Sequence, residues 1–321
     1  MHTKKPFVII ALVLAVSVSS SAQLTDILKK AQKIKKAADI YTPWTPEQET
    51  AIGEASAAKV INIFGLYESP DMVRYVNLVG NAVARQGARG IQYHFAILDT
   101  EAVTALSLPG GYIFVTRGAL ANMKNEAELA GTLGHEIAHV DRRHLEKQVR
   151  LQKTVQFAKE ETASHIPRGA ELIALAGEVI RNVLTMQVSR DGETEADKVG
   201  TDLTARAGYT PSGLRDFLLT LATASGNEGN RRQLGLWGST HPPFNDRVAT
   251  LNSMLNNYTA PGQMLQDRFN WYVNPLSFAR PVAGAVAAPG GNEVDGIVSN
   301  GVVVFVGGKL AEGARVKVRP Q

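Results

Sequence analysis

The sequence contains no cysteine, and this absence removes a whole set of chemistries. Disulfide bonds, thiol catalysis, iron–sulfur clusters and cysteine-ligated zinc sites are all excluded. The chain also lacks an excess of charge of one sign, because 34 Lys and Arg face 30 Asp and Glu. That balance gives no electrostatic reason to expect a nucleic-acid partner. With 321 residues, 44% of them hydrophobic, the chain is nevertheless long enough to bury a sizeable core.

Long apolar runs are lacking after the N-terminal segment. Residues 7–18 are almost entirely apolar, follow Lys4 and Lys5, and precede small residues that end at Ala22. This order is typical of a signal peptide over residues 1–22, and the run is shorter than the ~20 residues that span a bilayer. We therefore expect an exported, periplasmic protein that is cleaved after Ala22. The alternative is an uncleaved signal that anchors the chain in the membrane.

Proline, glycine and helix-capping residues indicate how the rest of the chain is divided. Helices dominate the pattern and a few strands precede the central helix, which predicts an α+β fold. The lysine-rich segment Leu24–Asp39 either contacts an anionic membrane surface or has a solvated face. Peripheral contact of the protein with the membrane or with envelope proteins is therefore a possible partnership. The sequence makes no prediction of the oligomeric state. The expected segments are an N-terminal helical segment (23–45), the main domain (46–279), a linker (280–292) and a β-rich tail (293–321).

The clearest chemical signal is Gly134–His139, with the sequence Gly-His-Glu-Ile-Ala-His, inside a helix predicted from Glu126 to about Leu151. His135 and His139 are four residues apart, so they lie on one side of the helix and can bind one Zn²⁺. Glu136 is turned by about 100° from His135, which favours a role as a base towards a water molecule. Two surface histidines on an ordinary amphipathic helix are the alternative.

The small residues of this segment are expected to have a role of their own. Gly134 and Ala138 carry almost no side chain. We therefore expect the backbone of a substrate to come close to the helix at these two positions.

A zinc site of this kind needs a third protein ligand. On a continuous helix His144 lies about 180° from His135, so it is expected to face away. Glu193 and Asp197 share one face of a helix predicted over Asp191–Ala207. One of these carboxylates can bind the metal while the other accepts a proton from a ligand imidazole. A charged, solvated helix start is the alternative for this segment.

Four stretches of the chain, in this order, resemble the zinc metallopeptidase family of HtpX, the CAAX prenyl proteases and the periplasmic β-barrel assembly-enhancing protease BepA. They are Leu108–Val115, Gly134–His144, Glu193–Asp197 and Thr240–Arg247. The resemblance is to the soluble, exported branch of the family. It implies a mainly helical, zincin-type metalloprotease domain with a small β-sheet edge over the active-site helix. One Zn²⁺ per chain is then held by His135, His139 and Glu193, with Asp197 beside them.

The resemblance also suggests roles for residues outside the two helices. The strand next to the cleft is expected to bind an extended peptide by strand addition, through Gly111, Tyr112, Ile113, Phe114 and Val115. In the family's periplasmic members the histidine of the His-Pro motif lies near the metal. His241 therefore either closes the metal's open position or helps at the oxyanion, and a loop histidine is the alternative. Arg247 is expected to pair with Asp197 or to lie on a helix surface.

The sequence thus predicts an exported, zinc-dependent endopeptidase that cleaves extended or misfolded polypeptides. Glu136 acts first as a base and then as an acid towards the leaving amine. A role in envelope protein quality control follows from the resemblance alone. The alternatives are a zinc-bound, chaperone-like binding protein whose protease site is held closed by His241, and a zinc hydrolase that acts on non-peptide substrates.

Overall fold

The computed structural model describes residues 42–159, 175–180, 182–183, 188–225, 241, 243–273, 293–299, 302–305 and 315–319. The predicted signal peptide, most of the 23–45 segment and the 280–292 linker lie outside these residues. Residues 44–152 belong with the described residues beyond 165 to one compact unit. A second unit, residues 1–43 and 153–164, is described only at residues 42–43 and in α6.

The described chain is mostly helical, with two small sheets, so the predicted α+β fold with a β-rich tail is confirmed. Its helices are α2 (Pro46–Phe64), α3 (Pro70–Ala84), α4 (Arg117–Asn122), α5 (Glu126–Asp141), α6 (His144–Lys159), α8 (Arg190–Arg206), α9 (Gly213–Ser225), α11 (Phe244–Leu255) and α12 (Gln266–Tyr272). Its strands are β1 (His94–Leu98), β2 (Ala105–Leu108), β3 (Tyr112–Thr116), β4 (Glu293–Ser299), β5 (Val302–Phe305) and β6 (Arg315–Arg319). In the part of the chain that the structure describes, none of the helices combines the length and hydropathy needed to cross a bilayer.

The first sheet has the strand order β1-β3-β2, with β1 parallel and β2 antiparallel to the central strand β3. This order corrects the prediction that Gly111, Tyr112, Ile113, Phe114 and Val115 form an edge that binds a peptide. Gly111 lies in the turn before β3, and the other four residues pair with β1 on one side and β2 on the other. Because both ladders are occupied, a peptide cannot add to β3.

The three strands are buried on both faces. Successive side chains of β3 point to opposite sides, as the period of two requires. Ile113 and Val115 belong to the core shared with α3 and α5, while Tyr112 and Phe114 pack in a second cluster with α2. The second sheet, in the tail, has the order β5-β4-β6.

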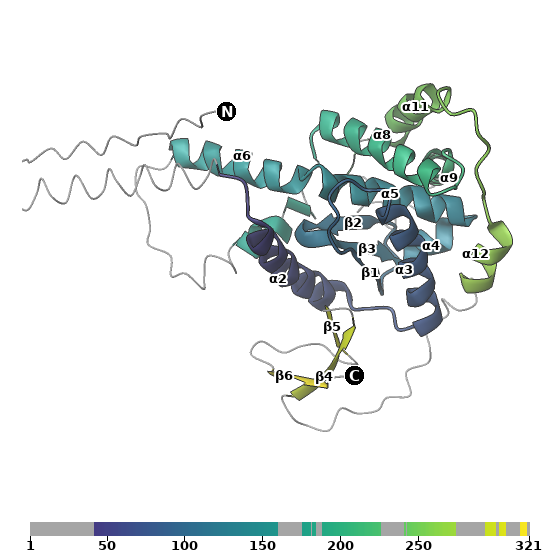
Figure 1. Ribbon diagram of the computed structural model, residues 1–321. Coiled ribbons are helices and arrows are strands. Elements are labelled where there is room, and N and C mark those ends of the chain that lie inside the picture. The colour runs from purple at the N-terminus through teal and green to yellow at the C-terminus, as the bar shows by residue number, and fades with distance from the viewer. Residues whose placement is uncertain are drawn as a thin grey trace, which may run out of the picture. The chain divides into compact units, whose positions relative to one another are not determined.

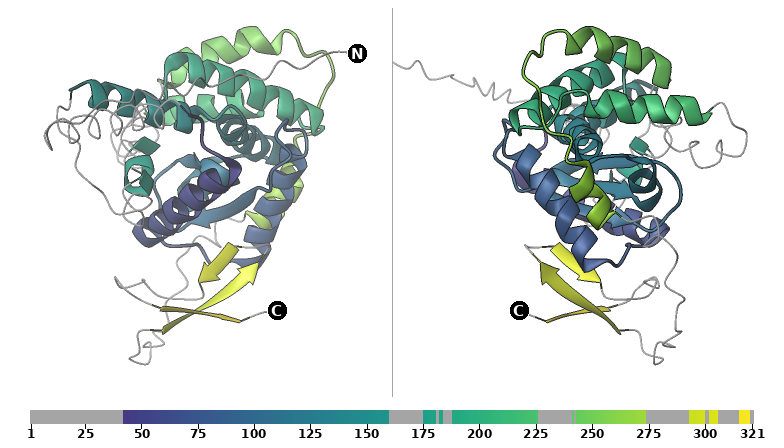
Figure 2. Two further views of the ribbon diagram at one scale, coloured as in Figure 1. Left: turned by 60° about the vertical axis from the view of Figure 1, so that its left-hand side comes forward. Right: turned by 90° about the vertical axis from the view of Figure 1, so that its right-hand side faces the viewer.

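Helix α5 lies between the first sheet and the helices α8 and α9 (Figures 1 and 2). Asn125 caps its start by accepting a hydrogen bond from the backbone N–H of Glu128. Every residue from Glu126 to Val140 is buried. A helix that is buried all round must meet its neighbours at short range, and glycines make this approach feasible.

Helix α8 comes within backbone contact of α5 at Gly134 and Gly200. A Cβ atom on Gly200 would lie 2.6 Å from the backbone N of His135, and one on Gly134 would lie 2.8 Å from the carbonyl O of Gly200. Gly134 therefore admits a neighbouring helix, and Ala138 is fully buried. The expectation that these two small residues admit a substrate backbone is wrong.

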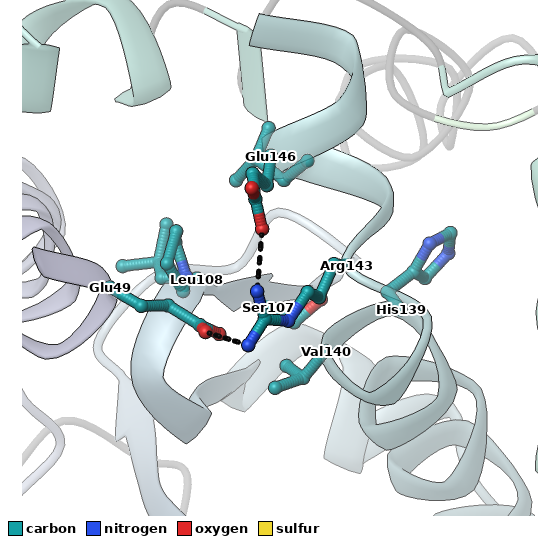
Figure 3. Close-up of a pocket in the computed structure, with 9 residues that line it drawn as sticks. Glu49, Ser107, Leu108, His139, Val140, Arg143 and Glu146 are labelled. Carbon is teal, nitrogen blue, oxygen red and sulfur yellow. Dashed lines mark hydrogen bonds and ion pairs between the residues drawn. The ribbon is translucent and has the colours of Figure 1, made fainter. Parts of the chain in front are cut away.

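The helix predicted from Glu126 to about Leu151 is in fact two helices. α5 ends at Asp141, α6 begins at His144, and Arg143 between them has a left-handed φ of 53°. The Arg143 guanidinium lies between two carboxylates, 3.4 Å from Oε2 of Glu49 and 3.3 Å from Oε2 of Glu146 (Figure 3). These contacts hold the break between the two helices in place.

Candidate metal centre

Four buried side chains from three segments converge beside the Gly134–Gly200 crossing. They are His135 and His139 from α5, Glu193 from the first turn of α8, and His241 from the segment before α11. Each offers one ligand atom, and these atoms all lie within 4.8 Å of one another. The residues predicted as ligands are therefore brought together, although a long stretch of chain separates the end of α5 from the start of α8.

The distances among these atoms suit a tetrahedral metal site. Nε2 of His135 lies 2.9 Å from Nε2 of His139. The Glu193 carboxylate oxygens lie 3.7 Å from Nε2 of His135 and 3.5 Å from Nε2 of His139. Ligand bonds of ~2.0–2.1 Å at tetrahedral angles put neighbouring ligand atoms about 3.3 Å apart, within the spread of these distances.

The protonation states of the group also suit a metal ion. Burial, reinforced by the charge of Arg247, lowers the pKa of His135 to about 4, and burial lowers the pKa of His139 well below its ordinary value. Both imidazoles are therefore neutral and can act as ligands. Burial raises the pKa of Glu193 to about 8. Among the described residues, neither of its carboxylate oxygens has a hydrogen-bond partner, which is the state that a bound cation would relieve.

Asp197 and Arg247 hold the first of these imidazoles in place. Oδ1 of Asp197 lies 2.9 Å from Nδ1 of His135 and accepts a hydrogen bond from it, which leaves the lone pair of Nε2 available to bind a metal. Arg247 donates to both oxygens of Asp197, at 2.6 and 3.1 Å. Burial alone would raise the pKa of Asp197, but the charge of Arg247 and the bond from His135 hold it well below its ordinary value. Arg247 is buried, so the alternative of a surface arginine is wrong.

Glu136 is buried at the edge of this group. Burial raises its pKa to about 7, against the lowering effects of a hydrogen bond from Ser107 and the charge of Arg247. Oε1 of Glu136 lies 3.8 Å from Nε2 of His241. A carboxyl group with a pKa near neutrality is suited to accept and return a proton.

A cavity opens beside these side chains. Its lining includes Glu136, His139, Glu193 and His241, and the strand β2 contributes to its wall. Further lining residues come from α6 and the segments around it: Leu145, Gln148, Asn182, Val183 and Val188. The group that could hold a metal is therefore reachable from a space into which a ligand could enter.

Two residues of the site were missed by reasoning from the sequence. Nδ1 of His144 lies 2.9 Å from Nδ1 of His139, and Nε2 of His144 lies 3.2 Å from Oε2 of Glu195. The expectation that His144 faces away is wrong because the helix breaks before it. The sequence spacing carries no signal for this contact, since the break is stabilised by residues distant in the chain.

Comparison with protein-family models matches residues 73–255 to peptidase family M48. The chain belongs to peptidase family M48. The matched residues run from α3 to the end of α11 and include all four converging side chains and Glu136. The predicted zinc metallopeptidase family is therefore confirmed, and so, at the level of the family, is the prediction of a metalloendopeptidase.

Curated relatives of this M48 chain are proteases from bacteria and mitochondria. It is 26% identical over 220 residues to the β-barrel assembly-enhancing protease of Yersinia pestis, and the aligned region covers 65% of this chain and 44% of that protein. It is 28% identical over 160 residues to the metalloprotease YcaL of Escherichia coli, covering 50% and 61%. The mitochondrial metalloendopeptidase OMA1 of Schizosaccharomyces pombe is 27% identical over 173 residues, covering 54% and 50%. The chain thus spans about half the length of the curated relatives it matches.

Proposed function

We propose that this chain is a zinc-dependent endopeptidase that cleaves extended or misfolded polypeptides outside the cytoplasm, in the quality control of envelope proteins. The observation that carries the proposal is the convergence of His135, His139 and Glu193 beside Glu136 in a member of a peptidase family. Similarity to relatives named β-barrel assembly-enhancing protease supports the envelope setting, and the signal-like residues 1–22 support export.

His135, His139 and Glu193 are proposed to bind one Zn²⁺ per chain, each with a different contribution. His135 and His139 supply neutral imidazole nitrogens, and Glu193, whose buried oxygens have no hydrogen-bond partner among the described residues, would supply a carboxylate oxygen and lose its proton when the cation binds. When bound, the metal would polarise the scissile carbonyl group and make a water molecule more acidic. Asp197, itself held by Arg247, keeps the proton of His135 on Nδ1.

Glu136 moves the protons of the reaction. It accepts a proton from the attacking water and then delivers it to the nitrogen of the leaving amine, so that no charged amide anion has to depart. Its raised pKa, about 7, allows both steps near neutral pH. Ser107, whose side chain opposes the rise in the pKa of Glu136, lines the cavity together with it.

The substrate is proposed to bind along β2, in place of the predicted strand β3. Among the described strands, β2 pairs with β3 on one side only. Ala105, Leu106 and Ser107 of this strand line the cavity together with Glu136 and His139. An extended or unfolded segment can add to such an edge through its backbone, which supports the proposed action on chains without folded structure.

His241 is proposed to regulate the open position of the metal site. Its imidazole lies within the ligand group, so it can cover the site; donation to the oxyanion is the other role that its position allows. A chaperone-like protein held permanently closed by His241 is not favoured, because Glu136 and the complete ligand set are retained.

The test compares the wild type with Glu136→Gln and with Glu47→Gln, an exposed control. Zinc content and cleavage of an unfolded substrate such as casein are measured with and without a chelator. We expect Glu136→Gln to keep its zinc and to lose about 10²–10⁴-fold in turnover, and the control to match the wild type. Near-normal cleavage by zinc-loaded Glu136→Gln, or chelator-resistant cleavage by the wild type, would refute the proposal.

A further inference from the structure

The second ligand imidazole has a neighbour with no role so far. Nδ1 of His139 faces Nδ1 of His144 at 2.9 Å, and both rings are buried. Nε2 of His144 in turn faces Oε2 of Glu195 at 3.2 Å. We infer that His144 and Glu195 are positioning residues, which fix the tautomer and orientation of His139 as a metal ligand. This inference rests on the proposed metal site.

The assignment of protons follows from the bonding. Nε2 of His139 points to the ligand group, 2.9 Å from Nε2 of His135, and must carry a lone pair there to bind a metal. A neutral imidazole then has its proton on Nδ1, which needs an acceptor. Nδ1 of His144 is in that position, and it can accept only if its own proton lies on Nε2.

Glu195 favours the tautomer of His144 that has its proton on Nε2. Its Oε2 accepts a hydrogen bond from Nε2–H of His144, and its Oε1 forms an ion pair with Nε of Arg142 at 3.1 Å. The opposite direction of bonding would place a proton on Nε2 of His139 and would deprive the metal of a ligand. Glu195, the last group in this series of hydrogen bonds, therefore determines which nitrogen of His139 is available to a metal.

Both proposed ligand imidazoles are thus oriented by a carboxylate of α8, one directly and the other through a second imidazole. Asp197 accepts from His135 directly, and Glu195 acts on His139 through His144. Glu193 completes the set as a ligand, so three acidic residues of α8 at every second position serve one site. The break between α5 and α6 makes this feasible, because it places His144 beside His139 instead of on the opposite face.

The test measures zinc affinity by competition with a chelator, and the absorption spectrum of the cobalt-loaded protein. Partners outside the ligand set typically change metal affinity 10–100-fold. We expect that loss in His144→Leu, which removes the acceptor. His144→Asn should stay within a few-fold of the wild type, because its Oδ1 can accept from Nδ1 of His139. Glu195→Ala, at a half-exposed position, should show an intermediate loss.

A matched control and the metal-free thermal midpoint separate positioning from folding. His94→Leu removes another partly buried histidine, which stacks on Tyr112 away from the ligand group, and should leave zinc affinity unchanged. If His144→Leu binds zinc as the wild type does, or if His144→Asn loses as much as His144→Leu, the inference is refuted. If His144→Leu fails to fold, Glu195→Ala decides, and unchanged affinity there refutes it. A wild type that binds no zinc would instead refute the proposed function.

Discussion

Replacing Gly200 by alanine should separate the two helices that carry the proposed metal ligands. The new Cβ atom would lie 2.6 Å from the backbone N of His135 and 2.8 Å from the carbonyl C of Gly134. Both contacts are with backbone, which cannot rotate away. Since ordinary contacts between such atoms begin near 3.4 Å, α5 and α8 must move apart by roughly 0.8 Å.

This displacement should change the free energy of unfolding little but the affinity for a metal ion strongly. Overpacking costs ~1–3 kcal/mol, and the higher helix propensity of alanine offsets up to ~1 kcal/mol of it. The thermal midpoint of the metal-free protein should therefore fall by only a few degrees. Functional groups, in contrast, must be held to about 0.5 Å. Because Glu193 and Asp197 move with α8, we expect zinc affinity to fall by at least about 10-fold.

Gly213→Ala provides the matched control. Gly213 is the first residue of α9, and its Cβ atom would lie 2.0 Å from the carbonyl O of Ala127. The clash is at the start of the same helix α5, about two turns from His135. Chelator competition and thermal unfolding should show a loss of stability without a loss of zinc affinity. Wild-type zinc affinity in Gly200→Ala, or an equal loss in Gly213→Ala, would refute the reasoning.

Three further changes test other contacts. Glu193→Gln should weaken zinc binding far more than Glu195→Gln, whose side-chain oxygen can still accept from an imidazole; equal zinc contents in the two variants would contradict the ligand assignment. His241→Ala should preserve or raise proteolysis if the imidazole covers the metal, whereas a fall of roughly 10²–10³-fold with zinc retained would establish the oxyanion role instead. Glu49 is buried, which raises its pKa, but its hydrogen bonds with Arg89 and the charge of that residue outweigh burial and hold the pKa below the ordinary 4.5. Its contribution to stability is therefore present above pH 4.5 and lost as the pH falls through the lower folded value, so Glu49→Gln should lower the thermal midpoint at pH 7 and converge with the wild type in acid.

Short-range features of the site could be predicted because they depend on helix geometry alone. The interval between His135 and His139 places both on one side of any helix, and the structure has them there. The helix also begins at Glu126 as predicted, with Asn125 as its N-terminal cap. Glu193 and Asp197 likewise share a face, and the structure directs one to the ligand group and the other to an imidazole.

Features that depend on which elements become neighbours could not be predicted in this way. The branched and aromatic residues of β3 indicate a strand, but its position between β1 and β2 is a matter of pairing between distant segments. Gly134 is small whether a substrate or a helix lies against it. Only the fold shows that Gly200 of α8 takes this space, and so brings the two helices of the site together.

The clearest failure of local reasoning, the break at Arg143, is also what completes the site. A left-handed residue other than glycine costs about 1 kcal/mol, and helix propensity gives no reason for it there. Ion pairs with Glu49 and Glu146 and a hydrogen bond to the carbonyl O of Trp44 offset that cost. Two of these partners, Glu49 and Trp44, lie more than 90 residues from Arg143 in the sequence, so no local sequence pattern predicts the contacts. Once the helix is broken, His144 turns from the far face to the ring of His139, and a half-exposed carboxylate on another helix is linked through it to a proposed metal ligand.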